Sequence, residues 1–391
     1  MLLLMKSFQF NTTAGLRVGS GRSTDTAPEV LSKLGKRILF ITDPGLKKLG
    51  LIDKTIEALK TNSEIIIFDR VEADPSLKTL MSVVDVGKEF NATGVIGFGG
   101  GSSMDVAKLC ALLIGSNEDI EEAWGVANAK GPRLPLVLYP TTAGTGSEVT
   151  PISIITVGGD EKKGVSSPVI LPDLAILDPD LTIGLPSHIT AATGIDAMVH
   201  AIEGYASKSV NNNIMSKMLA KEALSILGRS IKKAVFEGTD INARTDMLLG
   251  SMMAGMAFGN SPVAGVHALA YPLGGTFHIP HGLSNSLVLP HVLRFNIVDE
   301  NASRLYAELA PYLFPKMDIS SNDKEVSIKF IDNLASLSKE LGLEQKLRGL
   351  NIPEDACAKM ASDAMKQSRL LINNPREIKE KDAFDIYKLA W

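Results

Sequence analysis

Short β-branched runs alternate with amphipathic stretches through the first half of this 391-residue chain. The stretches between the runs, such as 51–60 and 76–90, have the period of helices. A strand followed each time by a helix favours a parallel sheet covered on both faces, because the helix returns the chain to the same edge of the sheet. The predicted strands are RILFIT (37–42), EIIIFD (64–69), GVIGFG (94–99) and LPLVLYP (134–140).

The second half of the chain has a different pattern. From Ser187 onward the apolar residues recur with the period of helices, and the helices are separated by prolines and glycines. The proline-rich segment 171–187 marks the change between the two patterns. We therefore predict two domains, an α/β domain over 1–185 and an all-helical domain over 186–391.

Composition excludes several classes of partner. The net charge is −4 and no segment is strongly basic, so we expect no nucleic-acid partner. No apolar stretch is long enough to span a bilayer and the first residues lack a signal-peptide pattern, so we expect no membrane partner and a cytoplasmic location. Cys110 and Cys357 lie among apolar residues without a CxxC pair, which predicts buried reduced thiols and excludes a thiolate zinc site.

Two clusters of glycine and hydroxyl residues each follow a predicted strand. GFGGGSSMDVAK (97–108) opens a helix, which Ser102 and Ser103 are placed to cap and whose N-terminus favours an anion. TTAGTGSEVT (141–150) offers backbone N–H groups and hydroxyls to a phosphate or a ribose. Both belong at the carboxyl edge of one sheet, where α/β folds bind ligands. A tight structural turn and a polar surface loop are the alternatives.

Asp43 ends the first predicted strand. A carboxylate at this place can bond the ribose hydroxyls of NAD and repel the additional phosphate of NADP. A simple Asp-Pro-Gly turn explains the residue equally well. Lys47 and Lys48 lie nearby, so NADP remains open beside NAD.

A metal site is predicted from histidine and aspartate spacing. Asp196 and His200 lie four residues apart and share one face of a helix, although such pairs are common by chance. That face is otherwise apolar, so a carboxylate there is costly unless it is paired or binds a metal. His267 and His281 would complete a site of three nitrogens and one oxygen, which suits Fe(II) or Zn(II). Glu203 is either a hydrogen-bond acceptor for a ligating imidazole or a solvated carboxylate.

Six segments occur in the order found in the iron-containing (group III) alcohol dehydrogenases, and the chain resembles this family from about residue 8 to its C-terminus. They are GGGSSMDVAK, PTTAGTGSEVT, LPDLAILDP, ATGIDAMVHAIEGY, VHALAYPLGG and FHIPHG. The resemblance implies an N-terminal nucleotide-binding α/β domain and a C-terminal all-α metal-binding domain, in a dehydroquinate synthase-like architecture. It also implies an active site in the cleft between the domains, and a homodimer.

The resemblance assigns roles to individual residues. The ligands of Fe²⁺, or of Zn²⁺, would be Asp196, His200, His267 and His281. The phosphate loop, the threonine-rich loop and one lysine would bind NAD or NADP together with Asp43. These residues are Gly99, Gly100, Gly101, Ser102, Ser103, Asp105, Thr141, Thr142, Thr145, Ser147 and Lys162.

Two positions depart from the family pattern. Tyr271 stands where many members have a histidine facing the nicotinamide, and Asp74 stands where many have asparagine. Tyr271 and His278 are therefore both candidates for the proton relay. The predicted reaction transfers a hydride between a primary or short-chain alcohol, or an aldehyde in reverse, and NAD(P), with the metal as Lewis acid.

Three other functions remain open. A maleylacetate-reductase-like enzyme would need further cations for the substrate's carboxylates, and the segments that carry the site show none. A polyol dehydrogenase or a cyclising synthase of the same superfamily is the second alternative. A non-enzymatic protein that binds NAD or a metal is the third.

Overall fold

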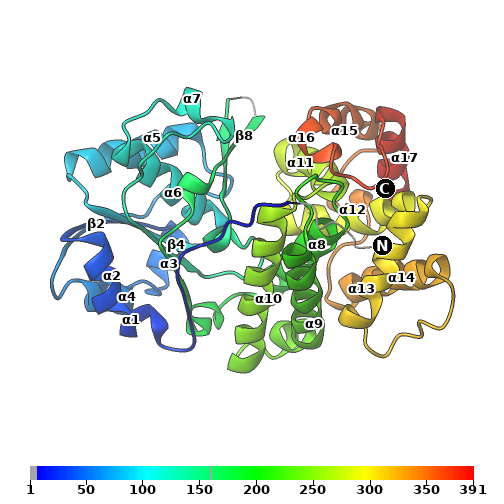
Figure 1. Cartoon of the computed structure of the whole chain (residues 1–391), viewed down its shortest axis with the longest axis horizontal. Coiled ribbons are helices and arrows are strands. Elements are labelled where there is room, and N and C mark those ends of the chain that lie inside the picture. Colours follow the sequence, from blue (N-terminus) through cyan, green and yellow to red (C-terminus); the bar gives the residue numbers. More distant parts are fainter. Residues whose placement is uncertain (1–6, 159–160) are drawn as a thin grey trace. The chain divides into compact units, whose positions relative to one another are not determined.

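The computed structural model describes residues 7–158 and 161–391, which form two compact units (Figure 1). The α/β unit is Asn11–Gly184 without residues 159 and 160, and the helical unit is residues 7–10 with Leu185–Trp391. Cys110 and Cys357 are both buried and free, as predicted. No helix in the described parts of the chain is long and apolar enough to cross a membrane.

A six-stranded sheet, parallel throughout, lies at the centre of the α/β unit. All four predicted strands are present, so the prediction of a parallel sheet is confirmed. Two strands were not predicted, because the first is too short to show a period and the other lies in the proline-rich segment. In spatial order the strands are β1 (Leu16–Val18), β9 (Leu174–Leu177), β6 (Leu136–Pro140), β4 (Gly94–Gly99), β2 (Arg37–Ile41) and β3 (Glu64–Phe68).

Side chains of the central strands alternate between two apolar cores. In β2, Leu39 and Ile41 join the core on one face of the sheet. Ile38 and Phe40 join the core on the other face. A strand buried on both faces has no polar side, which is why these strands appear in the sequence as continuous apolar runs. Figure 1 shows α5 (Leu77–Glu89) and α6 (Gly101–Gly115) on one face, and α2 (Ala27–Leu34) and α4 (Asp53–Leu59) on the other.

A second, three-stranded sheet has one strand before the threonine-rich loop and two after it. Strand β8 pairs in parallel with β5 and antiparallel with β7. This sheet was not predicted, although it carries Lys162. Its strands are β5 (Gly125–Val126), β7 (Ile152–Val157) and β8 (Glu161–Ser166). The short helices of the unit are α1 (Arg22–Asp25), α3 (Pro44–Lys48), α7 (Ile120–Ala123), η1 (Ser147–Val149), η2 (Pro168–Ile170) and η3 (Pro179–Thr182).

The described residues from Leu185 onward contain helices and no strands, so the all-helical prediction is confirmed. Side chains of Asn213, Asp240, Asp299 and Asn322 accept backbone N–H groups at the N-termini of four of these helices, which satisfies donors that a helix leaves unpaired. The helices are α8 (Ser187–Ala206), α9 (Ile214–Phe236), α10 (Ile241–Asn260), α11 (Gly265–Phe277), α12 (His281–Asn296), α13 (Glu300–Leu313), α14 (Asp323–Glu340), η4 (Leu347–Leu350), α15 (Ala356–Met365), α16 (Ser368–Leu371) and α17 (Glu380–Ala390).

Helix α8 is the central helix of this unit and packs against α9, α10 and α12. From Gly194 to Ala206 every residue is buried. Gly194 permits this packing, since a Cβ there would lie 2.8 Å from both Ile231 and Met247 side chains. The polar residues of this buried part of α8 therefore lie in the interior and need partners there.

Candidate active site

The four predicted metal ligands lie together in the helical unit. Asp196 and His200 come from α8, His267 from α11 and His281 from the first position of α12, and their ligand atoms lie within 4.8 Å of one another. The Nε2 atoms of His281 and His267 are 3.7 and 4.0 Å from Asp196 Oδ1. A tetrahedral ion with ligands at about 2.1 Å separates them by roughly 3.4 Å. The four atoms therefore lie close to the spacing that a bound ion requires.

A close approach of two helices brings His281 to this cluster. Gly282 lies against Ala192 of α8, and a Cβ at Gly282 would lie 2.4 Å from the Ala192 carbonyl oxygen. Real Cβ atoms do not come that close to a backbone oxygen, so only glycine fits after His281. The start of α12 can therefore touch α8 within one turn of Asp196.

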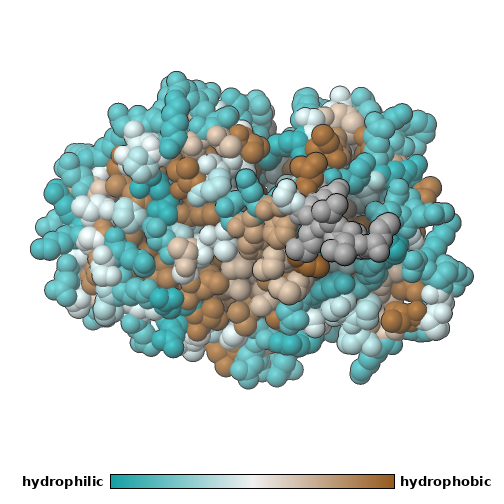
Figure 2. Space-filling model, in the orientation of Figure 1, coloured by the Kyte–Doolittle hydropathy of each residue, from teal (hydrophilic) through white to brown (hydrophobic). Residues whose placement is uncertain are grey.

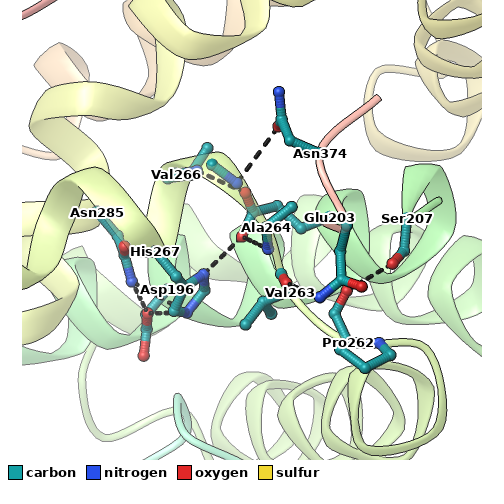
Figure 3. A network of polar contacts seen from close by, with 12 residues as sticks. Asp196, Glu203, Ser207, Pro262, Val263, Ala264, Val266, His267, Asn285 and Asn374 are labelled. Carbon is teal, nitrogen blue, oxygen red and sulfur yellow. Dashed lines mark hydrogen bonds and ion pairs between the residues drawn. The ribbon is translucent and has the colours of Figure 1, made fainter. Parts of the chain in front are cut away.

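Glu203 orients His267 (Figure 3). Its carboxylate accepts hydrogen bonds from His267 Nδ1 at 2.7 Å and from the backbone N–H groups of Ala264 at 3.0 Å and Val266 at 2.6 Å. Because a carboxylate only accepts, the imidazole proton lies on Nδ1, and Nε2 presents its lone pair to the cluster. Glu203 is 5% exposed, so of the two roles considered for it, the buried acceptor is the one observed.

Ring contacts fix His200. Its imidazole stacks on Phe258 of α10 at 4.2 Å between ring centroids, and on His267 at 4.7 Å. These two stacking contacts restrict the plane of the His200 ring. A ligand held in one orientation loses less conformational entropy when it binds a metal.

Asn285 completes the cluster and was not predicted. Its Nδ2 lies 2.6 Å from Asp196 Oδ1 and 3.3 Å from Nε2 of both His267 and His281. One amide nitrogen therefore lies within hydrogen-bond distance of three of the four predicted ligands. The spacing of Asn285, four residues after His281 on a helix, is the same signal that identified Asp196 and His200.

The cluster keeps its aspartate charged. Burial by itself raises the pKa of Asp196. The imidazoles of His200, His281 and His267, with the amide N–H of Asn285, outweigh burial and hold the pKa below its ordinary value. One carboxylate with three imidazoles is a donor set that suits Fe(II) and Zn(II).

The two glycine clusters meet at the carboxyl edge of the parallel sheet. They follow β4 and β6, which are neighbours, and a Cβ at Gly101 would lie 2.8 Å from Thr145 Cγ2. Gly99 has φ +150°, which favours glycine. Helix α6 begins at Gly101 with no side-chain cap, so the prediction that Ser102 and Ser103 cap it was wrong: both serines lie inside its first turn. The N-terminal N–H groups of α6 remain suited to an anion.

Asp105 and Ser147 take part in a buried network around Lys108. Ser147 Oγ donates to Asp105 Oδ1 at 2.6 Å, and Lys108 Nζ donates to Ser147 Oγ and to the Ile152 carbonyl, both at 2.7 Å. Burial lowers the pKa of Lys108 to about 8. The network joins α6 to the threonine-rich loop, so these two predicted cofactor-binding side chains have partners inside the α/β unit.

Two further predicted cofactor-binding residues also have partners in this unit. Asp43 is the N-cap of α3 and accepts the Leu46 N–H at 2.9 Å. Lys162 forms an ion pair with Asp74. Asp74 has φ +52°, a left-handed conformation that aspartate and asparagine tolerate better than most residues. The conformation therefore suits the aspartate of this chain as well as the asparagine that the family pattern has at this position.

The two candidates for the proton relay lie in different surroundings. The Tyr271 ring, on α11, has its centroid 6.2 Å from that of His281. His278 is the exposed C-cap of α11, with φ +54°. Among the described residues, its side chain has no hydrogen bond and no ring contact with the cluster. Tyr271 is thus the candidate beside the metal ligands.

Comparison with known proteins covers both units. Residues 16–179 match the family described as iron-containing alcohol dehydrogenase, and residues 190–391 match the C-terminal part of the Fe-containing alcohol dehydrogenase family. The chain belongs to the iron-containing alcohol dehydrogenases. The predicted family, the fold class and the assignment as an alcohol and aldehyde oxidoreductase are therefore confirmed.

Individual relatives of this iron-containing alcohol dehydrogenase match over nearly its whole length. Long-chain-alcohol dehydrogenase 1 of Geobacillus thermodenitrificans is 40% identical, over 96% of this chain and 94% of its own. A crystal structure of 1,3-propanediol oxidoreductase is 32% identical, with a TM-score of 0.93 over 98% of this chain and 100% of that one. Sulfoacetaldehyde reductase of Bifidobacterium kashiwanohense, solved in complex with NAD⁺, is 27% identical, with a TM-score of 0.84 over 98% of both chains.

Proposed function

We propose that this enzyme transfers a hydride between a primary or short-chain alcohol and NAD, using Fe²⁺, or Zn²⁺, held by Asp196, His200, His267 and His281. The observation that supports the proposal is the convergence of one charged carboxylate and three imidazoles in a buried part of the helical unit. When bound, the metal supplies a Lewis acid that lowers the pKa of the alcohol or polarises the aldehyde carbonyl.

The residues around the ligands keep the donor set ready. Glu203 holds the proton of His267 on Nδ1, so Nε2 faces the cluster without a proton. Phe258 keeps the ring of His200 in one plane. In this proposal the Tyr271 hydroxyl passes the alcohol proton toward solvent, because its ring lies beside His281, and His278 is the alternative.

The cofactor is proposed to bind at the carboxyl edge of the parallel sheet. The N-terminus of α6 and the threonine-rich loop, which touch at Gly101 and Thr145, offer N–H groups and hydroxyls to the pyrophosphate. NAD is proposed rather than NADP because Asp43 places a carboxylate at the end of β2, and because the Bifidobacterium relative was solved with NAD⁺.

We also propose that the enzyme is a cytoplasmic homodimer. Figure 2 shows apolar areas interspersed among hydrophilic residues on the face that it draws. Among the described residues, Val210, Ile214 and Met218 expose large apolar side chains in and before α9. A second copy would cover such residues. The two free cysteines fit a reducing compartment. Light scattering that gave the mass of a single chain would contradict the dimer.

The metal assignment is tested by removing single ligands. His267→Ala and His281→Ala should each lower bound iron or zinc and activity together, because each removes one of four ligands. His188→Ala, which removes an exposed imidazole from the first turn of α8, is the control and should change neither. Metal content would be measured by elemental analysis of the purified proteins, with activity assayed using NADH and a short aldehyde. Full metal occupancy in both ligand variants would contradict the assignment.

A further inference from the structure

Asn285 contacts three of the four predicted ligands without being one of them. It is completely buried on α12, one turn after His281. Its Nδ2 donates to Asp196 Oδ1 at 2.6 Å (Figure 3). The same oxygen faces His281 Nε2 at 3.7 Å and His267 Nε2 at 4.0 Å. The amide therefore contacts the carboxylate oxygen that lies closest to these two imidazoles.

The chemistry around Asn285 determines which end of the amide faces the cluster. An amide turned over by half a rotation would place its oxygen against Asp196 Oδ1, which is an acceptor. It would also place that oxygen against His267 Nε2, whose lone pair faces the cluster because Glu203 holds the ring proton on Nδ1. Acceptor would then face acceptor, so the nitrogen faces the ligands and the oxygen faces away.

The oxygen of this amide, which faces away from the ligands, has no hydrogen-bond partner among the described residues. This Asn285 Oδ1 atom is buried. Buried amides in folded proteins normally have both ends bonded, so packing alone does not account for an asparagine at this position. A leucine of nearly the same shape would fill the space without burying an unpaired oxygen. The bond to Asp196 is therefore the contact that an amide provides and a leucine does not.

We propose that Asn285 is a positioning residue for the metal ligand Asp196. Its N–H bond fixes the orientation of the carboxylate and occupies one lone pair of Oδ1. Asp196 then binds the metal through a single oxygen instead of through both. One coordination position stays open for the oxygen of the alcohol or aldehyde. The inference rests on the proposed function, because it requires that the cluster binds a metal.

The test compares Asn285→Leu, which removes the donor at nearly constant shape, with Asn285→Ala, which also empties the space. Ser286→Ala is the matched control, since Ser286 is the next residue of α12 and its buried Oγ has no hydrogen-bond partner among the described residues. Zn²⁺ affinity of the full chain would be measured by competition with a chromophoric chelator. We expect both Asn285 variants to bind Zn²⁺ roughly 10- to 100-fold more weakly and Ser286→Ala to bind as wild type does.

A second measurement separates positioning from direct ligation. X-ray absorption of the Zn²⁺-loaded proteins gives the number of nitrogen and oxygen ligands. We expect Asn285→Leu to keep that number or gain one, because Asp196 is then free to bind through both oxygens. A loss of one ligand would make Asn285 itself a ligand and overturn the positioning role.

Other outcomes also overturn the inference. Wild-type Zn²⁺ affinity and an unchanged coordination number in folded Asn285→Leu would leave Asn285 as a packing residue. Equal losses in Ser286→Ala would show that any buried change in α12 weakens the site. If the wild-type chain bound neither Zn²⁺ nor Fe²⁺, the proposed function would fail first, and with it this inference. Circular dichroism identifies variants that do not fold, and Asn285→Ala then stands in for Asn285→Leu.

Discussion

Three of the four predicted ligands are held by neighbouring side chains of different chemical kinds. Glu203 holds His267 by a charged hydrogen bond, Phe258 holds His200 by stacking and Asn285 holds Asp196 by an amide. His281 instead owes its place to backbone packing at the start of α12. A metal site depends on such contacts as much as on its ligands, because they decide the direction in which each lone pair points.

The relay is tested at the scale of single residues. Tyr271→Phe should lower turnover roughly 100-fold or more, because a phenylalanine ring keeps the contact with His281 and loses only the hydroxyl. His278→Asn should leave turnover almost unchanged, and asparagine tolerates the left-handed conformation found there. Metal content, measured in parallel, should equal that of wild type in both variants. A large loss of turnover in metal-loaded His278→Asn alone would instead assign the relay to His278.

Helix α12 shows how one backbone contact positions a ligand. Gly282→Ala should weaken metal binding and lower the melting temperature, because its Cβ would meet the Ala192 carbonyl oxygen at 2.4 Å and push α12 away from α8. Gly274→Ala on α11 is the control, since its Cβ would lie an ordinary 3.6 Å from the Ile279 carbonyl oxygen. Chelator competition and thermal unfolding would measure the two effects. Equal metal affinity in the two variants would contradict the role of Gly282.

The pH dependence of stability tests the threonine-rich loop. Burial raises the pKa of Glu148 to about 7. A hydrogen bond from its own backbone N–H and the charge of Lys108 lower the pKa, but they offset only part of the effect of burial. The folded state then binds more protons than the unfolded state between the ordinary glutamate pKa and pH 7. Stability from this group is therefore present in acid and lost as pH rises to about 7.

Glu148→Gln removes that titration. The wild type should lose unfolding free energy relative to Glu148→Gln as the pH rises from about 5 to about 7.5. Denaturant unfolding at several pH values measures the difference, with Glu89→Gln on the exposed side of α5 as the control. Parallel pH profiles for wild type and Glu148→Gln would contradict the raised pKa.

The elements that could be predicted are those whose pattern is local. Strands β2, β3, β4 and β6 have five or six residues and are rich in apolar side chains, and α8 carries Asp196 and His200 at helical spacing. Strand β9 was not predicted, because its four residues lie between prolines and become a strand only through their neighbours in the sheet. The two-residue β5 has no pattern of its own and depends on pairing with β8.

The residues of the site also divide into those that a local sequence pattern predicts and those that it does not. Its four ligands were found because histidine is rare and chemically distinctive and because their segments resemble those of the family. Asn285 lies at the same helical spacing from His281, but asparagine is common in turns and caps, so that spacing alone did not single it out. The surroundings of Asp105 and of the relay candidates depend on which distant residues meet them. Ser147 reaches Asp105 across 42 positions of sequence, and no local pattern records such a contact.

At the scale of the whole molecule, the proposed metal and the proposed cofactor belong to different units. The metal ligands and their supports Glu203 and Asn285 all lie in the helical unit. The two loops proposed for NAD lie in the α/β unit, which has its own apolar cores. Each ligand should therefore stabilise a different part of the chain.

Hydrogen exchange of backbone amides tests this division. In metal-depleted protein, Zn²⁺ should slow exchange in residues 194–205 and 264–285, because the ion joins α8, α11 and α12. NAD⁺ should slow exchange in residues 97–105 and 141–150, whether or not metal is present. At about 100 times the dissociation constant, a ligand stabilises the state that binds it by about 2.7 kcal/mol, so amides that open with the site should exchange about 100-fold more slowly.

His281→Ala is the control, and it should lose most of the Zn²⁺ effect and keep the NAD⁺ effect. Protection by NAD⁺ confined to the helical unit would contradict the assignment of the two loops.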